Sequence, residues 1–167
     1  MYIRKQMHSI ILREIQKADD PVIANIIRNT LAEFGANRPG TVFFDSTTDH
    51  LYETFQSADS IYFIAELNGE IVGGAGIFHS AGLPEDTCEL VKMYLLPQAR
   101  GIGIGRRLLD SCLDAARRMH FKKCYLETLP ELHDAIALYE ANGFVSLSQP
   151  IGNTGHFGCD IWMIKTL

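Results

Sequence analysis

The stretch Pro97–Arg107, PQARGIGIGRR, is the segment of this 167-residue chain that decides its fold. It follows an apolar, strand-like segment that ends at Leu96, and it leads into a predicted helix over residues 104–119. Glycines lack a Cβ atom, so the backbone can approach a ligand closely and direct several successive N–H groups at one point. Three glycines alternate in this turn: Gly101, Gly103 and Gly105.

Positive charge adds to this arrangement at the start of the predicted helix. Unpaired N–H groups and the helix dipole favour an anion at a helix N-terminus. Arg100 and Arg106 flank the glycines and favour the anion further. The turn therefore predicts a phosphate or pyrophosphate site, in preference to a glycine-rich turn that merely changes the direction of the chain.

A dinucleotide-binding module is a rival interpretation of the same turn, because Glu127 ends the next predicted strand. Its fingerprint, G-x-G-x-x-G, needs a third small residue for close packing of the helix on the strand. The two possible registers place Arg106 or Leu108 at that position, and residues 97–100 separate the strand from the glycines. Both departures disfavour NAD or FAD as the ligand.

Outward from the turn, segments of period two alternate with segments of period 3.6, which predicts one mixed α/β unit without a repeat or a long linker. Asn68-Gly69 predicts a type I′ hairpin turn. Asp20 as N-cap and Pro21 at the first helical position predict a helix start. The expected strands cover residues 7–16, 61–67, 70–80, 87–97, 122–128, 144–148 and 159–167, and the expected helices cover 21–34, 48–57, 104–119 and 131–142.

Composition and charge exclude several classes of protein. No run approaches the ~18 apolar residues of a membrane helix, and only Ser9–Leu12 separate His8 from Arg13, which is too short for a signal peptide. The net charge of -5, with scattered basic residues, disfavours nucleic acid. The four cysteines lack C-x-x-C spacing, which favours reduced thiols. We therefore expect a cytoplasmic protein that neither enters a membrane nor binds nucleic acid.

Two motifs together carry a resemblance to a known family. R-G-I-G-I-G at Arg100–Gly105 and ALYEANGF at Ala137–Phe144 occur in the order and separation typical of the GNAT superfamily of acyl-CoA-dependent N-acetyltransferases, which the chain resembles over Cys88–Phe144. The resemblance implies a single α/β (α+β) domain over residues 1–167. In such a domain a mixed, mostly antiparallel sheet of six to seven strands is flanked by about four helices and splays at the cofactor cleft.

The same resemblance implies acetyl-CoA as cosubstrate and assigns residues to it. The strand before the turn would lie along the pantetheine arm, and the turn would hold the pyrophosphate. The implied cofactor-binding residues are Met93, Tyr94 and Leu95 on the strand, and Arg100, Gly101, Ile102, Gly103, Ile104, Gly105 and Arg106 in the turn.

Acetyl transfer to an amine needs a group that takes a proton and a group that gives one to the leaving thiolate. Period two places residues 89, 91, 93 and 95 on one face, so Glu89 is expected beside the pantetheine and is the preferred base, with Glu127 or a water relay as alternatives. Tyr139, in the second motif, is the expected acid. Where the family often has an asparagine that contacts the cofactor, this chain has Leu132.

The acceptor, a primary amine of a small molecule or peptide, is less well defined by the sequence. Phe43 and Phe44 either fill the core from a loop, the slightly favoured interpretation, or line a pocket, and Asn153 and His156 lie in a glycine-rich loop that can face the acceptor. His156 and Cys159 lack a second ligand pair, so no metal is expected. A non-catalytic acyl-CoA sensor is the alternative from another class. The resemblance also makes a homodimer possible.

Overall fold

The computed structural model describes residues 8–167, so Met7, the expected start of the first strand, and the basic pair Arg4 and Lys5 lie outside the described residues. The backbone forms one seven-stranded sheet in the order β1-β2-β3-β4-β5-β7-β6. Only β4 and β5 run parallel. The strands are β1 (Ile10–Glu14), β2 (Ile61–Leu67), β3 (Glu70–Phe78), β4 (Thr87–Leu95), β5 (Lys123–Thr128), β6 (Val145–Leu147) and β7 (Ile161–Thr166).

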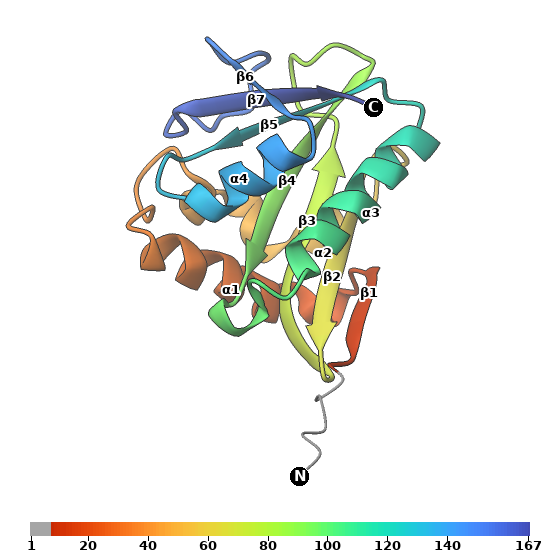
Figure 1. Cartoon of the computed structure of the whole chain (residues 1–167), viewed down its shortest axis with the longest axis vertical. Helices are drawn as coiled ribbons and strands as arrows, with labels where there is room; N and C mark the ends of the chain where they lie inside the picture. The colour runs from red at the N-terminus through yellow and green to blue at the C-terminus, as the bar shows by residue number, and fades with distance from the viewer. Residues whose placement is uncertain (1–7) are drawn as a thin grey trace.

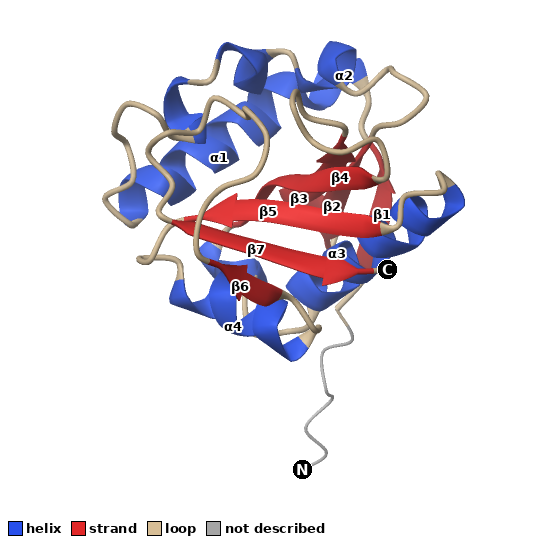
Figure 2. Cartoon of the chain, turned by 90° about the horizontal axis from the view of Figure 1, so that it is seen from above, coloured by secondary structure: helices blue, strands red, loops and turns tan. Residues whose placement is uncertain are grey.

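Helices cover both faces of this sheet (Figures 1 and 2). One face carries α1 (Asp20–Glu33) and α2 (Leu51–Thr54), and the other carries α3 (Ile104–Arg118) and α4 (His133–Ala141). The order of elements confirms the predicted mixed fold. The second helix is shorter than the expected 48–57, because residues 46–49 form a separate 3-10 turn before it and Phe55 is already its C-cap.

Apolar spacing explains how α1 packs on the sheet. Ile23, Ile27 and Leu31 recur every four residues and are fully buried in a core shared with β2. The predicted N-cap at Asp20 is wrong by one residue, because Asp19 precedes the helix as its N-cap. The Asp20 carboxylate instead accepts the backbone N–H of Tyr52 at 2.8 Å, which ties α2 to the start of α1.

Two left-handed residues close the β2–β3 hairpin as predicted. Asn68 has φ 54° and Gly69 has φ 86°, the backbone conformation that a type I′ turn requires. The hairpin is continuous with β4, which pairs antiparallel with β3. These strands form the half of the sheet that ends at the cleft.

The sheet splays between β4 and β5, as expected from the resemblance. The two strands pair only where Thr87–Glu89 meet Lys123–Tyr125, although β4 continues to Leu95. Beyond Glu89 this edge of β4 has no strand neighbour, and Figure 1 shows the two strands diverging. The separation opens the space in which the candidate site lies.

A β-bulge in β4 overturns one expectation about the site. Lys92 has φ 51°, and the register with β3 shifts between the pairs Gly76↔Val91 and Gly74↔Tyr94. An extra residue in a strand reverses the alternation of side chains beyond it. Glu89 and Val91 therefore do not share a face with Met93 and Leu95, which instead pack toward α3.

Two further observations concern the whole described chain. Cys88, Cys112, Cys124 and Cys159 are free and buried. Within residues 8–167, every helix is too short or too polar to cross a membrane.

Candidate active site

A cavity of about 600 Å³ occupies the space between the splayed strands. Its walls come from α1, from β4 beyond the point of separation, from the glycine turn, from the end of β5 and from α4. Most of the residues predicted to act on substrates line it: Glu89, Met93, Tyr94, Leu95, Arg100, Gly101, Gly103, Gly105, Arg106, Glu127, Tyr139 and His156.

The glycine turn presents open backbone to one end of this cavity. Gly101 has φ 74° and Gly103 has φ 89°, and a Cβ atom added at either would meet nothing within 4 Å. Gly103 is also the N-cap of the 15-residue helix α3. An anion therefore has room beside unpaired N–H groups at a helix N-terminus, which fits a bound pyrophosphate.

The two arginines of the turn are already paired within the protein. The guanidinium of Arg100 donates to the Glu33 carboxylate at 2.7 and 2.9 Å and lies 5.2 Å from the centroid of the Phe34 ring. Its Nε donates to the Leu95 carbonyl at 3.0 Å. Arg106 pairs with Asp110 one turn further along α3. Arg100 thus anchors the turn to α1, and each of the two guanidinium groups beside the phosphate position shares its charge with a carboxylate.

The side chains of the two isoleucines in the turn do not line the cavity. Ile102 is 40% exposed, whereas Ile104 is fully buried in the core under α3. Only their backbone groups are placed to meet a ligand. Tyr94 also lines the cavity, and its side chain lies on the face of β4 opposite to that of Met93. Burial raises the pKa of its phenol.

Glu89 lies where β4 and β5 separate, and only 2% of it is exposed. Burial raises the pKa of its carboxyl to about 7, against the lowering effect of a hydrogen bond from the Ser80 hydroxyl to Oε2. Among residues 8–167, no group donates a hydrogen bond to its other oxygen, Oε1. This carboxyl can therefore exchange a proton near neutral pH, as a general base requires.

Glu127 has a different environment, although it also faces the cavity. Its Oε1 accepts the Tyr125 hydroxyl at 2.8 Å, and its Oε2 accepts the Thr154 hydroxyl at 2.7 Å. Each oxygen of this carboxyl therefore already accepts one hydroxyl hydrogen. The structure thus favours Glu89 over Glu127 as the group that receives a proton.

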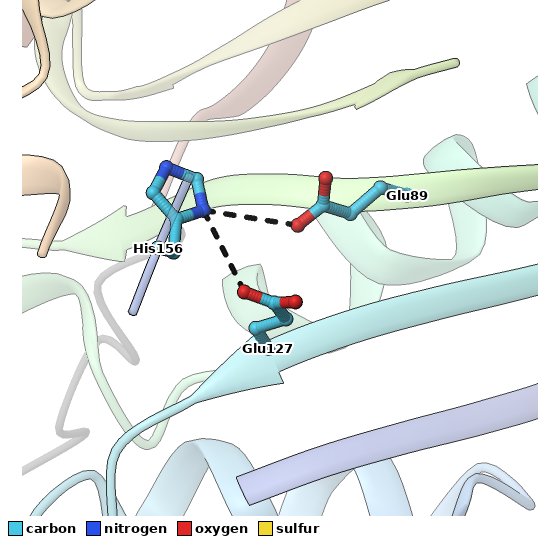
Figure 3. A group of neighbouring side chains, drawn as sticks. All are labelled: Glu89, Glu127 and His156. Atoms are coloured by element: carbon cyan, nitrogen blue, oxygen red, sulfur yellow. Dashed lines mark ion pairs between the residues drawn. The ribbon is translucent and has the colours of Figure 1, made fainter. Parts of the chain in front are cut away.

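His156 lies beside these two carboxyls (Figure 3) and beside a third one. Its Nδ1 is 3.9 Å from Glu89 Oε1 and 3.9 Å from Glu127 Oε2, while its Nε2 is 3.5 Å from Asp45 Oδ2. Residues from β4, from β5, from the loop before β7 and from the loop before α2 thus meet at one point.

Asp45 and Lys92 belong to this site, and the sequence interpretation missed both. Lys92 Nζ lies 2.6 Å from Asp45 Oδ2, and Lys92 is only 7% exposed because the bulge directs it inward. Burial acts to raise the pKa of Asp45, but contacts with His156 and Lys92 and the Thr47 backbone N–H together hold it well below its usual range. A lysine within the apolar run ELVKMYL was the only available signal.

Tyr139 extends from α4 into the same cavity and is 5% exposed. Its ring packs against Phe144 with centroids 5.8 Å apart, and burial raises the pKa of its phenol. The hydroxyl therefore keeps its proton at neutral pH and can donate it. Leu132, where the family often has asparagine, contributes an apolar side chain to the cavity wall.

A second hollow of about 410 Å³ adjoins the first, and both include Thr41 and His156. Phe44 borders it with 61% of its surface exposed, whereas Phe43 is half-buried against the α1 core. The core-filling interpretation thus suits Phe43 and the pocket interpretation suits Phe44. The exposed Asn153 belongs to the lining of neither hollow.

An extended ligand that carries phosphate at one end fits the main cavity, and its other end then meets the carboxyls and the tyrosine. The splayed sheet and this cleft together have the form expected of an acyl-CoA-dependent N-acetyltransferase. Comparison with known proteins agrees: the sequence model of the acetyltransferase (GNAT) family matches residues 27–144. This chain belongs to the acetyltransferase (GNAT) family and is an acetyl-CoA-dependent N-acetyltransferase.

Three relatives illustrate the similarity. The uncharacterized N-acetyltransferase YjgM of Escherichia coli K12 is 41% identical over 160 residues, which cover 95% of this chain and 96% of YjgM. The fold matches yncA of Salmonella typhimurium, solved with its cofactor acetyl-CoA, with a TM-score of 0.73, 23% identity and coverage of 95% and 94%. It matches PaiA N-acetyltransferase of Thermoplasma acidophilum, solved with coenzyme A, with a TM-score of 0.74, 19% identity and coverage of 95% and 99%.

Proposed function

We propose that this protein transfers the acetyl group of acetyl-CoA directly to a primary amine, with Glu89 as the general base and Tyr139 as the general acid. The observation that carries the proposal is the buried Glu89 carboxyl, with a pKa raised to about 7, at the point where the sheet opens. Glu127 positions the neighbouring Thr154 and Tyr125 hydroxyls. A non-catalytic acyl-CoA sensor has no need for such a base.

Acetyl-CoA supplies the activated acetyl group as a thioester. Its pyrophosphate would bind the turn at Gly101–Arg106, and its pantetheine arm would lie along the free edge of β4 at Met93, Tyr94 and Leu95. The proton lost by the attacking amine goes to Glu89, and Tyr139 gives its phenolic proton to the departing thiolate. Cys159 is the cysteine that lines this cavity among residues 8–167, and burial raises the pKa of its thiol, which disfavours a covalent acyl-enzyme and supports direct transfer.

The acceptor would reach the base through the second hollow, which shares His156 with the main cavity. The exposed ring of Phe44 offers an apolar contact to the body of the acceptor, and Asp45 and Glu127 favour an amine that arrives as a cation. We assign Phe44 and His156 to acceptor contact on these grounds. Phe43 and Asn153, which line neither hollow, have no such support.

Three wider features belong to the same proposal. The chain has one N-acetyltransferase domain, since the described strands from Ile10 to Thr166 share one sheet. The protein acts in the reducing cytoplasm, since its four cysteines are free. A homodimer follows from the family resemblance alone, and sedimentation equilibrium of the purified chain tests it.

Amine-dependent release of CoA tests the proposed function directly. We expect the wild-type protein to release CoA from acetyl-CoA when a suitable primary amine from a panel of small amines and peptides is present. Glu89→Gln, which preserves shape and the Ser80 contact, is expected to lose about 10²- to 10⁴-fold in kcat. Glu127→Gln is the matched control and is expected to lose less. Equal losses in the two variants would move the base away from Glu89.

A further inference from the structure

His156 forms part of the wall between the two hollows. It lines both of them, and its side chain is 16% exposed. Its Nδ1 faces the carboxyls of Glu89 and Glu127 (Figure 3). Its Nε2 faces Asp45, which borders the second hollow. The imidazole therefore connects the enclosed base to the more open side of the site.

Asp45 determines which imidazole nitrogen carries the proton. Its carboxylate stays ionised because His156 and Lys92 hold its pKa well below the usual range despite burial. Asp45 Oδ2 lies 3.5 Å from Nε2, nearer than the two glutamate oxygens at 3.9 Å from Nδ1, which favours a hydrogen on Nε2. A neutral imidazole then has its lone pair on Nδ1. This lone pair lies on the side of Glu89 Oε1, the carboxyl oxygen that Ser80 does not occupy.

We propose that His156 is a proton relay that takes from Glu89 the proton removed from the amine, and that Asp45 positions it for this role. The inference rests on the proposed function of Glu89. In the relay step the O–H bond of the neutral Glu89 carboxyl breaks and an Nδ1–H bond forms, which restores the Glu89 carboxylate and leaves His156 as imidazolium. After the product leaves, the Nδ1 proton passes to water and the starting tautomer returns.

Charged groups from several elements surround His156. Glu89 and Lys92 face it from β4, Glu127 from β5 and Asp45 from the loop before α2, and the buried Cys159 thiol lies in its own loop. Three carboxyls and one lysine thus lie around the imidazole. The separation of 3.9 Å between Nδ1 and Oε1 requires a small side-chain rotation or one bridging water.

The tautomer of His156 tests the proposal without any acceptor substrate. Long-range ¹H–¹⁵N spectra of the protein with bound CoA, above neutral pH, report which ring nitrogens of each histidine carry hydrogen. His156→Gln identifies the signal by its loss. We expect hydrogen on Nε2 in the wild type and a mixture of tautomers in Asp45→Asn. Hydrogen on Nδ1 in the wild type would overturn the proposal, because that nitrogen then could not accept a proton.

Rescue by added bases tests the proton transfer itself, with an amine that the wild type acetylates. His156→Ala is expected to lower kcat about 10- to 100-fold, with KM for acetyl-CoA unchanged. Imidazole is expected to restore part of kcat, whereas pyrazole, which has a similar shape but is far less basic, is not. His50→Gln is the control, because His50 is exposed and lines neither hollow.

The possible outcomes separate the relay from the transferase function. Equal rescue by imidazole and pyrazole, or full activity in His156→Ala, would reduce His156 to a structural role. A wild-type protein that acetylates no amine would contradict the proposed function, and the tautomer measurement would still decide the orientation of His156.

Discussion

At the scale of single residues, the two glutamates beside the cleft differ in how their oxygens are used. Both oxygens of Glu127 accept hydroxyl hydrogens, whereas Glu89 Oε1 accepts no hydrogen bond from residues 8–167 and lies 3.9 Å from His156 Nδ1. Hydrogen bonds to an ionised carboxylate stabilise it, and burial without them raises the pKa. Hydrogen bonding and burial, and not the residue type, therefore support the proposed assignment of the base to Glu89.

Tyr139→Phe tests the acid at this scale. The variant keeps the ring that packs against Phe144, so the fold and the cavity wall remain. We expect kcat to fall about 10-fold or more, because the thiolate loses its proton donor. The dissociation constant of acetyl-CoA, measured by calorimetry, is expected to change less than twofold. A parallel loss of cosubstrate affinity and turnover would give Tyr139 a binding role instead.

The sequence predicted these titratable residues but not their partners. Glu89, Glu127, Tyr139 and His156 were recognisable from strand ends, a motif and a glycine-rich loop. The ion pair of Asp45 with Lys92 joins residues 47 positions apart, and its geometry depends on a bulge. Neither periodicity nor a local motif reports a contact of that kind.

At the scale of elements, the glycine turn and the splayed strand β4 determine where a cosubstrate can bind. The order of strands and helices was predictable because each element has its own periodicity and its own start or stop residues. The change of face within β4 was not predictable, because a bulge has no signature in a single sequence when the left-handed residue is a lysine. Period two therefore placed Met93 and Leu95 on the same face of the strand as Glu89, whereas the bulge puts them on the opposite face.

Gly103→Ala tests the turn, with Gly69→Ala as a matched control. Both glycines have left-handed φ and open space around a hypothetical Cβ atom, so each substitution is expected to cost about 1–2 kcal/mol in stability. Only Gly103 lies at the predicted phosphate position. We expect acetyl-CoA affinity, measured by calorimetry, to fall at least tenfold in Gly103→Ala and to stay unchanged in Gly69→Ala. Equal affinities would contradict a phosphate site at this turn.

At the scale of the whole molecule, the buried base makes stability depend on pH. The Glu89 carboxyl would ionise near 4.5 without the fold and ionises at about 7 within it. Between these values the folded protein retains a proton that the unfolded chain has released, so rising pH lowers the free energy of unfolding. The difference corresponds to about 3 kcal/mol above pH 7.

Glu89→Gln tests this linkage through denaturant unfolding at pH 5 and pH 8. We expect the variant to be more stable than the wild type at pH 8, by about 1–3 kcal/mol, and to differ less at pH 5. The pKa of Asp45 is lowered, so its contribution to the free energy of unfolding changes only at more acidic pH. It therefore does not affect the comparison between pH 5 and pH 8. A variant that gains no stability at pH 8 relative to pH 5 would show that Glu89 ionises normally.

The pH dependence of kcat/KM tests the central claim most directly, namely that the Glu89 carboxyl is the base for acetyl transfer. With saturating acetyl-CoA and a primary amine that the wild type acetylates, the account predicts a rise in wild-type kcat/KM with a midpoint near pH 7, from the ionisation of Glu89. It predicts that Glu89→Gln lacks this rise, so that the remaining pH dependence of its kcat/KM comes from the ionisation of the amine substrate alone. The same midpoint in both proteins would contradict the account.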